Sequence, residues 1–135
     1  MSTHRRHWTF LAIVALLAIA CGGKTGAPSA PPGTGLEITA AAGPVCPVET
    51  IPPDPGCEPR LVPNATIVVK DKTGATVATV VTDPNGTALV GLPAGDYVVE
   101  PQAAEGLMGT AASEPVTVVN GTITQILVLY DTGIR

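Results

Sequence analysis

The chain has 135 residues, with seven Lys or Arg against eleven Asp or Glu, and a formal net charge of −4. This acidic balance argues against nucleic-acid binding, because proteins that bind nucleic acids carry clustered positive charge. The length fits one domain, and aromatic residues make up only 3% of it, so side chains that could stack on sugars are scarce.

The first twenty residues have the pattern of an export signal. Arg5 and Arg6 precede an apolar run over residues 9–20. At ~1.5 Å per residue this run reaches under ~20 Å, too short for a hydrocarbon core of ~30 Å. A basic start, a short apolar segment and small residues at its end are typical of a secretory signal. Two glycines and a Pro-rich stretch follow, which argues against the N-terminal core helix of a cytosolic domain.

The apolar run ends in LAIAC, residues 17–21, which resembles the lipobox of bacterial lipoproteins. The resemblance implies that Cys21 is diacylated and becomes the first mature residue. Two or more acyl chains anchor a protein stably, at ~0.8 kcal/mol per buried CH₂. Ala18 stands where Leu is commonest, and a plain signal peptide that leaves Cys21 free is the alternative. Gly22 in place of Asp resembles the pattern sent to the outer membrane in Gram-negative envelopes, so we expect an extracytoplasmic, lipid-anchored protein.

Residues 22–35 read GGKTGAPSAPPGTG, a composition typical of a flexible linker with a reach of ~20 Å. We therefore predict a lipoprotein signal peptide at 1–20, a lipidated tether at 21–35 and a folded domain at 36–135. The chain after the signal would hold five basic and eleven acidic residues, a formal charge of −6. Its expected membrane contact is thus the lipid on Cys21 and not electrostatic attraction to anionic lipids.

A strand predicted at 36–42 is followed by a Pro-rich loop that holds Cys46 and Cys57. In an exported protein, two nearby cysteines are expected to pair. Closing this loop of about 12 residues would stabilise the fold by roughly 3 kcal/mol on the chain-entropy model. The alternative, a redox or metal pair, fits less well, because the spacing is not Cys-x-x-Cys and no histidine remains after the signal is removed.

From residue 65 onward, short strands alternate with turns. The turn chemistry includes Asp83-Pro84-Asn85-Gly86 and the hairpin signal Asn120-Gly121. Val, Thr and Ile dominate the segments between them, and no segment has convincing helical periodicity. We therefore predict an all-β fold, a single β-sandwich of about seven strands. The longest apolar run, residues 126–130, is expected in the middle of a sheet.

The segment 64–101 resembles the carboxypeptidase regulatory-like domain, a small transthyretin-like, or prealbumin-like, β-sandwich that is related to repeat domains of Gram-positive adhesins. The resemblance implies a mostly accessory role as a stalk, a spacer or a module that binds sugars or proteins. The pattern is a strand, D-x-x-G, a strand, T-D-x-x-G, a strand and G-L-P-x-G-x-Y. It is carried here by Asp71, Gly74, Thr82, Asp83, Gly86, Gly91, Leu92, Pro93, Gly95 and Tyr97.

Within this segment, Leu92, Tyr97 and Val99 are expected in the core, with the Tyr97 hydroxyl satisfied at the edge. Adhesin relatives carry a Lys–Asn isopeptide bond promoted by a buried acid, for which Glu100 is the candidate. Glu100 follows Tyr97 by three residues and not four, so it belongs on the opposite face of its strand. The first predicted strand also has no lysine, so we predict no isopeptide bond.

We predict no catalytic residue, no metal site and no cofactor. The chain after the signal has no histidine to act as a base for Ser29 or Ser113, and Asp71 and Asp83 are expected to cap turns. The predicted function is a non-enzymatic, lipid-anchored cell-envelope protein that presents a β-sandwich for structural or protein-interaction roles. The alternative is an accessory module that binds a glycan or peptide. The expected partners are the membrane, through the lipid on Cys21, and an envelope protein or glycan, but not nucleic acid.

Overall fold

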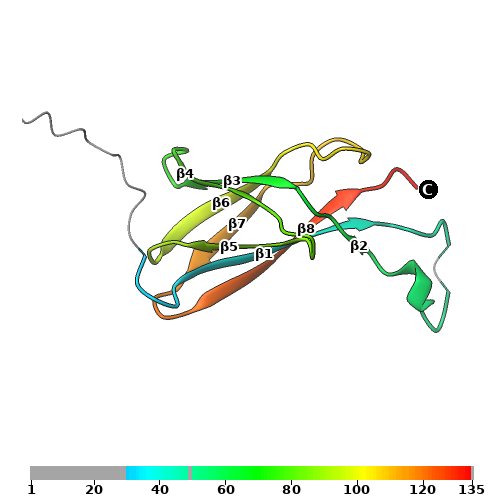
Figure 1. Cartoon of the computed structure of the whole chain (residues 1–135), viewed down its shortest axis with the longest axis horizontal. Helices are drawn as coiled ribbons and strands as arrows, with labels where there is room; N and C mark the ends of the chain where they lie inside the picture. Colours follow the sequence, from blue (N-terminus) through cyan, green and yellow to red (C-terminus); the bar gives the residue numbers. More distant parts are fainter. Residues whose placement is uncertain (1–29, 49, 135) are drawn as a thin grey trace, which may run out of the picture.

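A computed structural model describes residues 30–48 and 50–134. Within them, two β-sheets pack face to face as a sandwich, with one short 3-10 helix outside it (Figure 1). The elements in chain order are β1 (Gly35–Gly43), η1 (Pro55–Cys57), β2 (Arg60–Leu61), β3 (Thr66–Asp71), β4 (Thr76–Val81), β5 (Thr87–Gly91), β6 (Gly95–Pro101), β7 (Glu114–Val118) and β8 (Ile123–Asp131).

Each sheet contains four strands. In the first sheet, β1 lies in the centre, with β5 and β2 antiparallel along one side and β8 parallel along the other. The second sheet is antiparallel throughout, in the order β4-β3-β6-β7. β1 and β8 are the first and last strands of the domain, and they pair over nine residues. The pairing therefore holds the two terminal strands of the domain together.

The core lies between the two sheets and follows the two-residue period of the strands. Leu36, Ile38 and Ala40 of β1 are fully buried, as are Ile67 and Val69 of β3. The residues between them in β1 and β3 are less buried and face outward. This alternation confirms the predicted all-β sandwich. The described residues form eight strands against about seven predicted, because the two-residue β2 pairs with the end of β1.

The expectation that the run 126–130 lies in the middle of a sheet is wrong. β8 pairs with β1 alone and is therefore an edge strand. Its inward residues Val128 and Tyr130 are buried, whereas Leu127 and Leu129 are 58% and 52% exposed. The apolar run predicts a central strand that is covered on one face and partly on the other, but β8 lies at the edge of its sheet and buries only its inner face.

The other core and turn predictions are confirmed. Leu92, Tyr97 and Val99 are buried, and the Tyr97 hydroxyl donates to the Pro93 carbonyl at 2.8 Å. Burial raises the pKa of the Tyr97 phenol. Asp71 and Asp83 both cap turns, because each carboxylate accepts two backbone N–H groups of the residues that follow it. The hydroxyl and amide of Thr73 lower the pKa of Asp71.

The predicted signal peptide, most of the tether and Cys21 lie outside the described residues. The last two residues of the predicted tether are within the fold: Thr34 is 2% exposed, and Gly35 begins β1. The Thr34 hydroxyl accepts the Gly121 N–H at 2.8 Å, which ties the chain entry to the β7–β8 turn. No helix in the described part of the chain is long and apolar enough to cross a membrane.

Candidate interaction surface

The segment 44–59, described except for residue 49, forms a loop between β1 and β2, here called the disulfide loop. Cys46 and Cys57 are bonded within it, with their Cα atoms 5.3 Å apart, so the predicted disulfide is confirmed. The loop projects from the end of the sandwich at which β1 finishes, and η1 forms part of its return (Figure 1). The Thr132 hydroxyl donates to the Pro44 carbonyl, which joins the start of the loop to the residue after β8.

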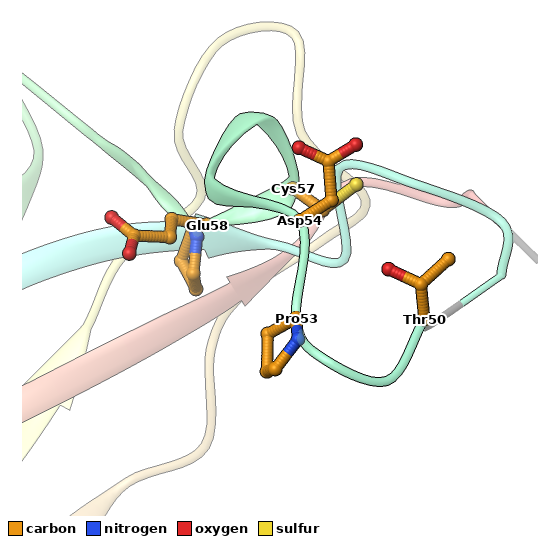
Figure 2. A pocket seen from close by; sticks show the side chains of 6 residues that line it. Thr50, Pro53, Asp54, Cys57 and Glu58 are labelled. Atoms are coloured by element: carbon orange, nitrogen blue, oxygen red, sulfur yellow. The ribbon is translucent and has the colours of Figure 1, made fainter.

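One side of the disulfide loop encloses an open pocket of about 270 Å³, lined by Thr50, Pro53, Asp54, Cys57, Glu58 and Pro59. Asp54 is part of the loop structure, because its carboxylate accepts the Gly56 N–H at 2.8 Å and caps η1. Figure 2 shows the side chains of Glu58 and Thr50 on opposite sides of Pro53, so the polar groups do not converge on one point. This geometry offers a shallow contact surface and no acid–base pair.

The disulfide also borders the outer face of the first sheet. A second hollow of about 370 Å³ is lined by Gly43, Pro44, Cys46, Cys57, Pro59 and Leu129. Beside it, the strand register places Ala41 opposite both Leu61 of β2 and Leu129 of β8. These three residues form a continuous apolar row across the sheet, and both leucines are 52% exposed. The row and the disulfide therefore form one apolar surface.

Two further apolar side chains of the disulfide loop face solvent. Val48 is 69% exposed and Ile51 is 100% exposed. Single exposed apolar residues are ordinary on protein surfaces, whereas contiguous ones rimmed by polar groups mark interaction sites. Together with the apolar row, these residues make the end of the sandwich that carries the loop the candidate interaction surface.

The outer face of the second sheet has a different character. Its main contact is an ion pair of 2.6 Å between Lys70 of β3 and Glu100 of β6, two residues on neighbouring strands. The bonded lysine holds the pKa of the Glu100 carboxyl below its ordinary value. Glu100 thus points outward, opposite to Tyr97, as its spacing predicted. It is paired with a lysine in a salt bridge and is not the buried acid of an isopeptide site.

Sequence reasoning found the disulfide but missed the apolar row. The alternation of apolar and polar residues in 123–131 contains its signal, because Leu127 and Leu129 lie two residues apart and so share a face. The contribution of Leu61 could not be found in this way, since β2 has only two residues. Among the described residues, no three His, Cys, Asp or Glu side chains lie close enough together to hold a metal ion.

No family model and no curated protein sequence matches this chain. Among solved structures, GBS52, the minor pilin of Streptococcus agalactiae, is similar over 73% of this chain at 16% identity and a TM-score of 0.56. The TIE protein of Bacillus anthracis is similar over 71% of it at 22% identity and a TM-score of 0.52. The chain matches only 44% and 17% of the lengths of these two proteins. The similarity shows a shared β-sandwich fold, of the kind found in a Gram-positive pilin.

Proposed function

We propose that this protein is a non-enzymatic, lipid-anchored cell-envelope protein that uses its β-sandwich to make protein contacts. The observation that carries the proposal is the apolar surface formed by the apolar row and the disulfide loop. Exposed and contiguous, this surface is of the kind that binds other proteins. The name of the S. agalactiae relative, a minor pilin, supports a structural or adhesive role on the same fold.

The position of this surface supports a role in presentation. The described chain begins at one end of the sandwich, and the disulfide loop projects from the opposite end (Figure 1). β1 links the two ends over nine residues, a span of roughly 30 Å at about 3.3 Å per residue. A chain held to a membrane at its N-terminus would therefore carry the loop on the side away from the membrane.

The lipid anchor is proposed from the lipobox resemblance at Cys21, and the disulfide supports export because such bonds persist in oxidising compartments. Fractionation of cells that make the full chain tests the anchor. We expect the protein in the membrane fraction, with an intact mass that includes acyl groups on Cys21. Cys21→Ser should release it, whereas the neighbouring control Gly23→Ala should not. A Cys21→Ser protein that stays in the membrane would refute the anchor.

The contact surface is tested separately, with a photo-reactive residue placed in the full chain in intact cells. At Ile51 we expect covalent adducts with another protein chain. At Val81, which is 56% exposed on the second sheet, the yield should stay at background. Equal yields at the two positions would refute the proposal that the loop end makes the protein contacts.

The described residues favour protein contacts over the alternative of a sugar-binding module. Sugar sites use exposed aromatic faces, but Tyr97 and Tyr130, the two tyrosines of the chain, are both buried. The Tyr130 hydroxyl donates to the Gln102 carbonyl at 2.9 Å, and burial raises the pKa of this phenol. Neither ring is available to stack on a ligand.

A further inference from the structure

β8 has an edge that no other described strand covers. It pairs with β1 over nine residues without a register shift, and with no strand on its other side. At its start, the Thr124 hydroxyl donates to the Thr117 carbonyl of β7. At its end, the Asp131 carbonyl accepts the Met108 N–H at 2.9 Å. The open strip of the edge is therefore 125–129.

The direction in which the backbone groups of this strip point follows from the hydrogen bonds at the two ends of the β1–β8 ladder. The Thr122 carbonyl accepts the Gly35 N–H, and the Thr132 N–H donates to the Gly43 carbonyl. In a parallel ladder, alternate residues bond to one neighbour, so the even-numbered residues of β8 face β1. The N–H and C=O groups of Gln125, Leu127 and Leu129 consequently point to the open side.

The other edge strands are shorter or protected. β4 has six residues and a register shift where it pairs with β3, and β5 has five. β7 has five residues and begins with Glu114 and Pro115, a charge and a proline that hinder the pairing of edges. β8 has no charged residue and no proline from residue 123 to residue 130. By these criteria it is the least protected edge in the described part of the chain.

We infer that the open edge of β8 pairs antiparallel with the same edge of a second copy of this chain. Under a two-fold axis, odd-numbered residues meet odd-numbered residues, so both copies offer their free N–H and C=O groups at matching positions. The two four-stranded sheets would then form one continuous sheet across the dimer. The leucines at 127 and 129 of the two copies would lie side by side on its outer face.

Charge leaves this strip as a place where a second copy can approach. The described residues include ten acidic and three basic side chains, so two copies repel each other over much of their surface. The strip 125–129 is uncharged, and two such strips can approach without opposing like charges. A pairing of five residues from each copy is a small contact, so the dimer is weak and depends on concentration.

This inference does not depend on the lipid anchor or on the disulfide loop, and its cross-linking positions differ from those that test the contact surface. A photo-reactive residue at Leu127 of the full chain should give an adduct of twice the chain mass in the cells that make it. The control is Leu89, which is 66% exposed on the same face of the same sheet but lies on the far side of β1. The inference would be overturned if the yield of doubled-mass adduct at 127 did not exceed the yield at 89. It would also be overturned if the adduct at 127 had another mass.

A second pair of variants separates contact through the edge from contact through the face. Leu129 and Leu61 lie opposite the same residue, Ala41, and are equally exposed. In the cross-linking chain, Leu129→Lys should lower the doubled-mass yield about tenfold, because a charged lysine on an edge strand hinders the pairing of edges. Leu61→Lys should leave the yield unchanged. Equal losses for the two variants would overturn pairing through the edge.

Discussion

The two outer faces of this sandwich present different surfaces. On the strands of the first sheet, five large apolar side chains are exposed: Leu61, Leu89, Ile123, Leu127 and Leu129. On the described strands of the second sheet, Val81 is the one such residue, and the face carries the Lys70–Glu100 ion pair. The fold needs only the inner faces, so this difference is the ground for our proposal that the outer face of the first sheet makes the protein contacts.

The largest expected effect comes from the disulfide loop, which borders the apolar face. Replacing both Cys46 and Cys57 by Ser should lower the free energy of unfolding by ~3 kcal/mol, because the unfolded chain regains the entropy of the closed loop. Urea unfolding measures this change. Under native conditions, the backbone amides of β3 and β6 in the second sheet should keep their relative protection from hydrogen exchange. An unchanged free energy of unfolding would contradict the structural role of the bond.

A smaller loss of stability is expected from a substitution in the turn at residues 83–86, which contacts the first sheet. Gly86 has φ = 70°, and a Cβ there would lie 2.8 Å from the Ala40 carbonyl oxygen. Gly86→Ala should cost ~2 kcal/mol or more, from the left-handed backbone and the crowded carbonyl. Gly74 has φ = 84° with open space around its Cβ position, so Gly74→Ala should cost ~1 kcal/mol.

The two glycine variants are compared by thermal and urea unfolding under the same conditions. If both lose the same stability, the contact between the Asp83–Gly86 turn and β1 is not specific. The difference between them therefore measures the close approach alone, since the backbone strain is common to both.

The smallest effect is expected on the second sheet. Lysine pairing lowers the pKa of Glu100, so its contribution to stability is present above the unfolded-state pKa of about 4.3 and is lost as the pH falls through the folded-state value. Lys70→Met should flatten this part of the pH profile and change stability little at pH 7, because both partners are about one-third exposed. A large loss at neutral pH would show that this face contributes more than a surface ion pair.

The sequence predicted the layers of this fold better than it predicted its edges. Two-residue alternation and turn residues such as Asp83 and Gly86 were enough for the strands, because both depend on local geometry. The place of β8 was not accessible in this way. Strand order depends on contacts between residues far apart in the chain, such as Leu36 with Thr124, and an apolar run does not reveal whether its second face is covered.

The candidate surface was predictable to the same limited extent. The pairing of Cys46 and Cys57 could be predicted, because the number of cysteines and the export signal can both be read from the sequence. The apolar row could not be predicted, because Leu61 and Leu129 are 68 positions apart and meet only through Ala41. Their placement depends on the return of the disulfide loop to the end of β1.

The most direct test of the contact surface combines its two parts in one measurement. A photo-reactive residue at Ile51 is placed in the full chain, and adduct yield is measured with Leu61→Lys and Leu129→Lys introduced together. We expect the double substitution to abolish the adducts, while Val81→Lys on the second sheet leaves them unchanged. Adducts that persist in the double variant, or that disappear equally with Val81→Lys, would contradict the assignment of contacts to the apolar face.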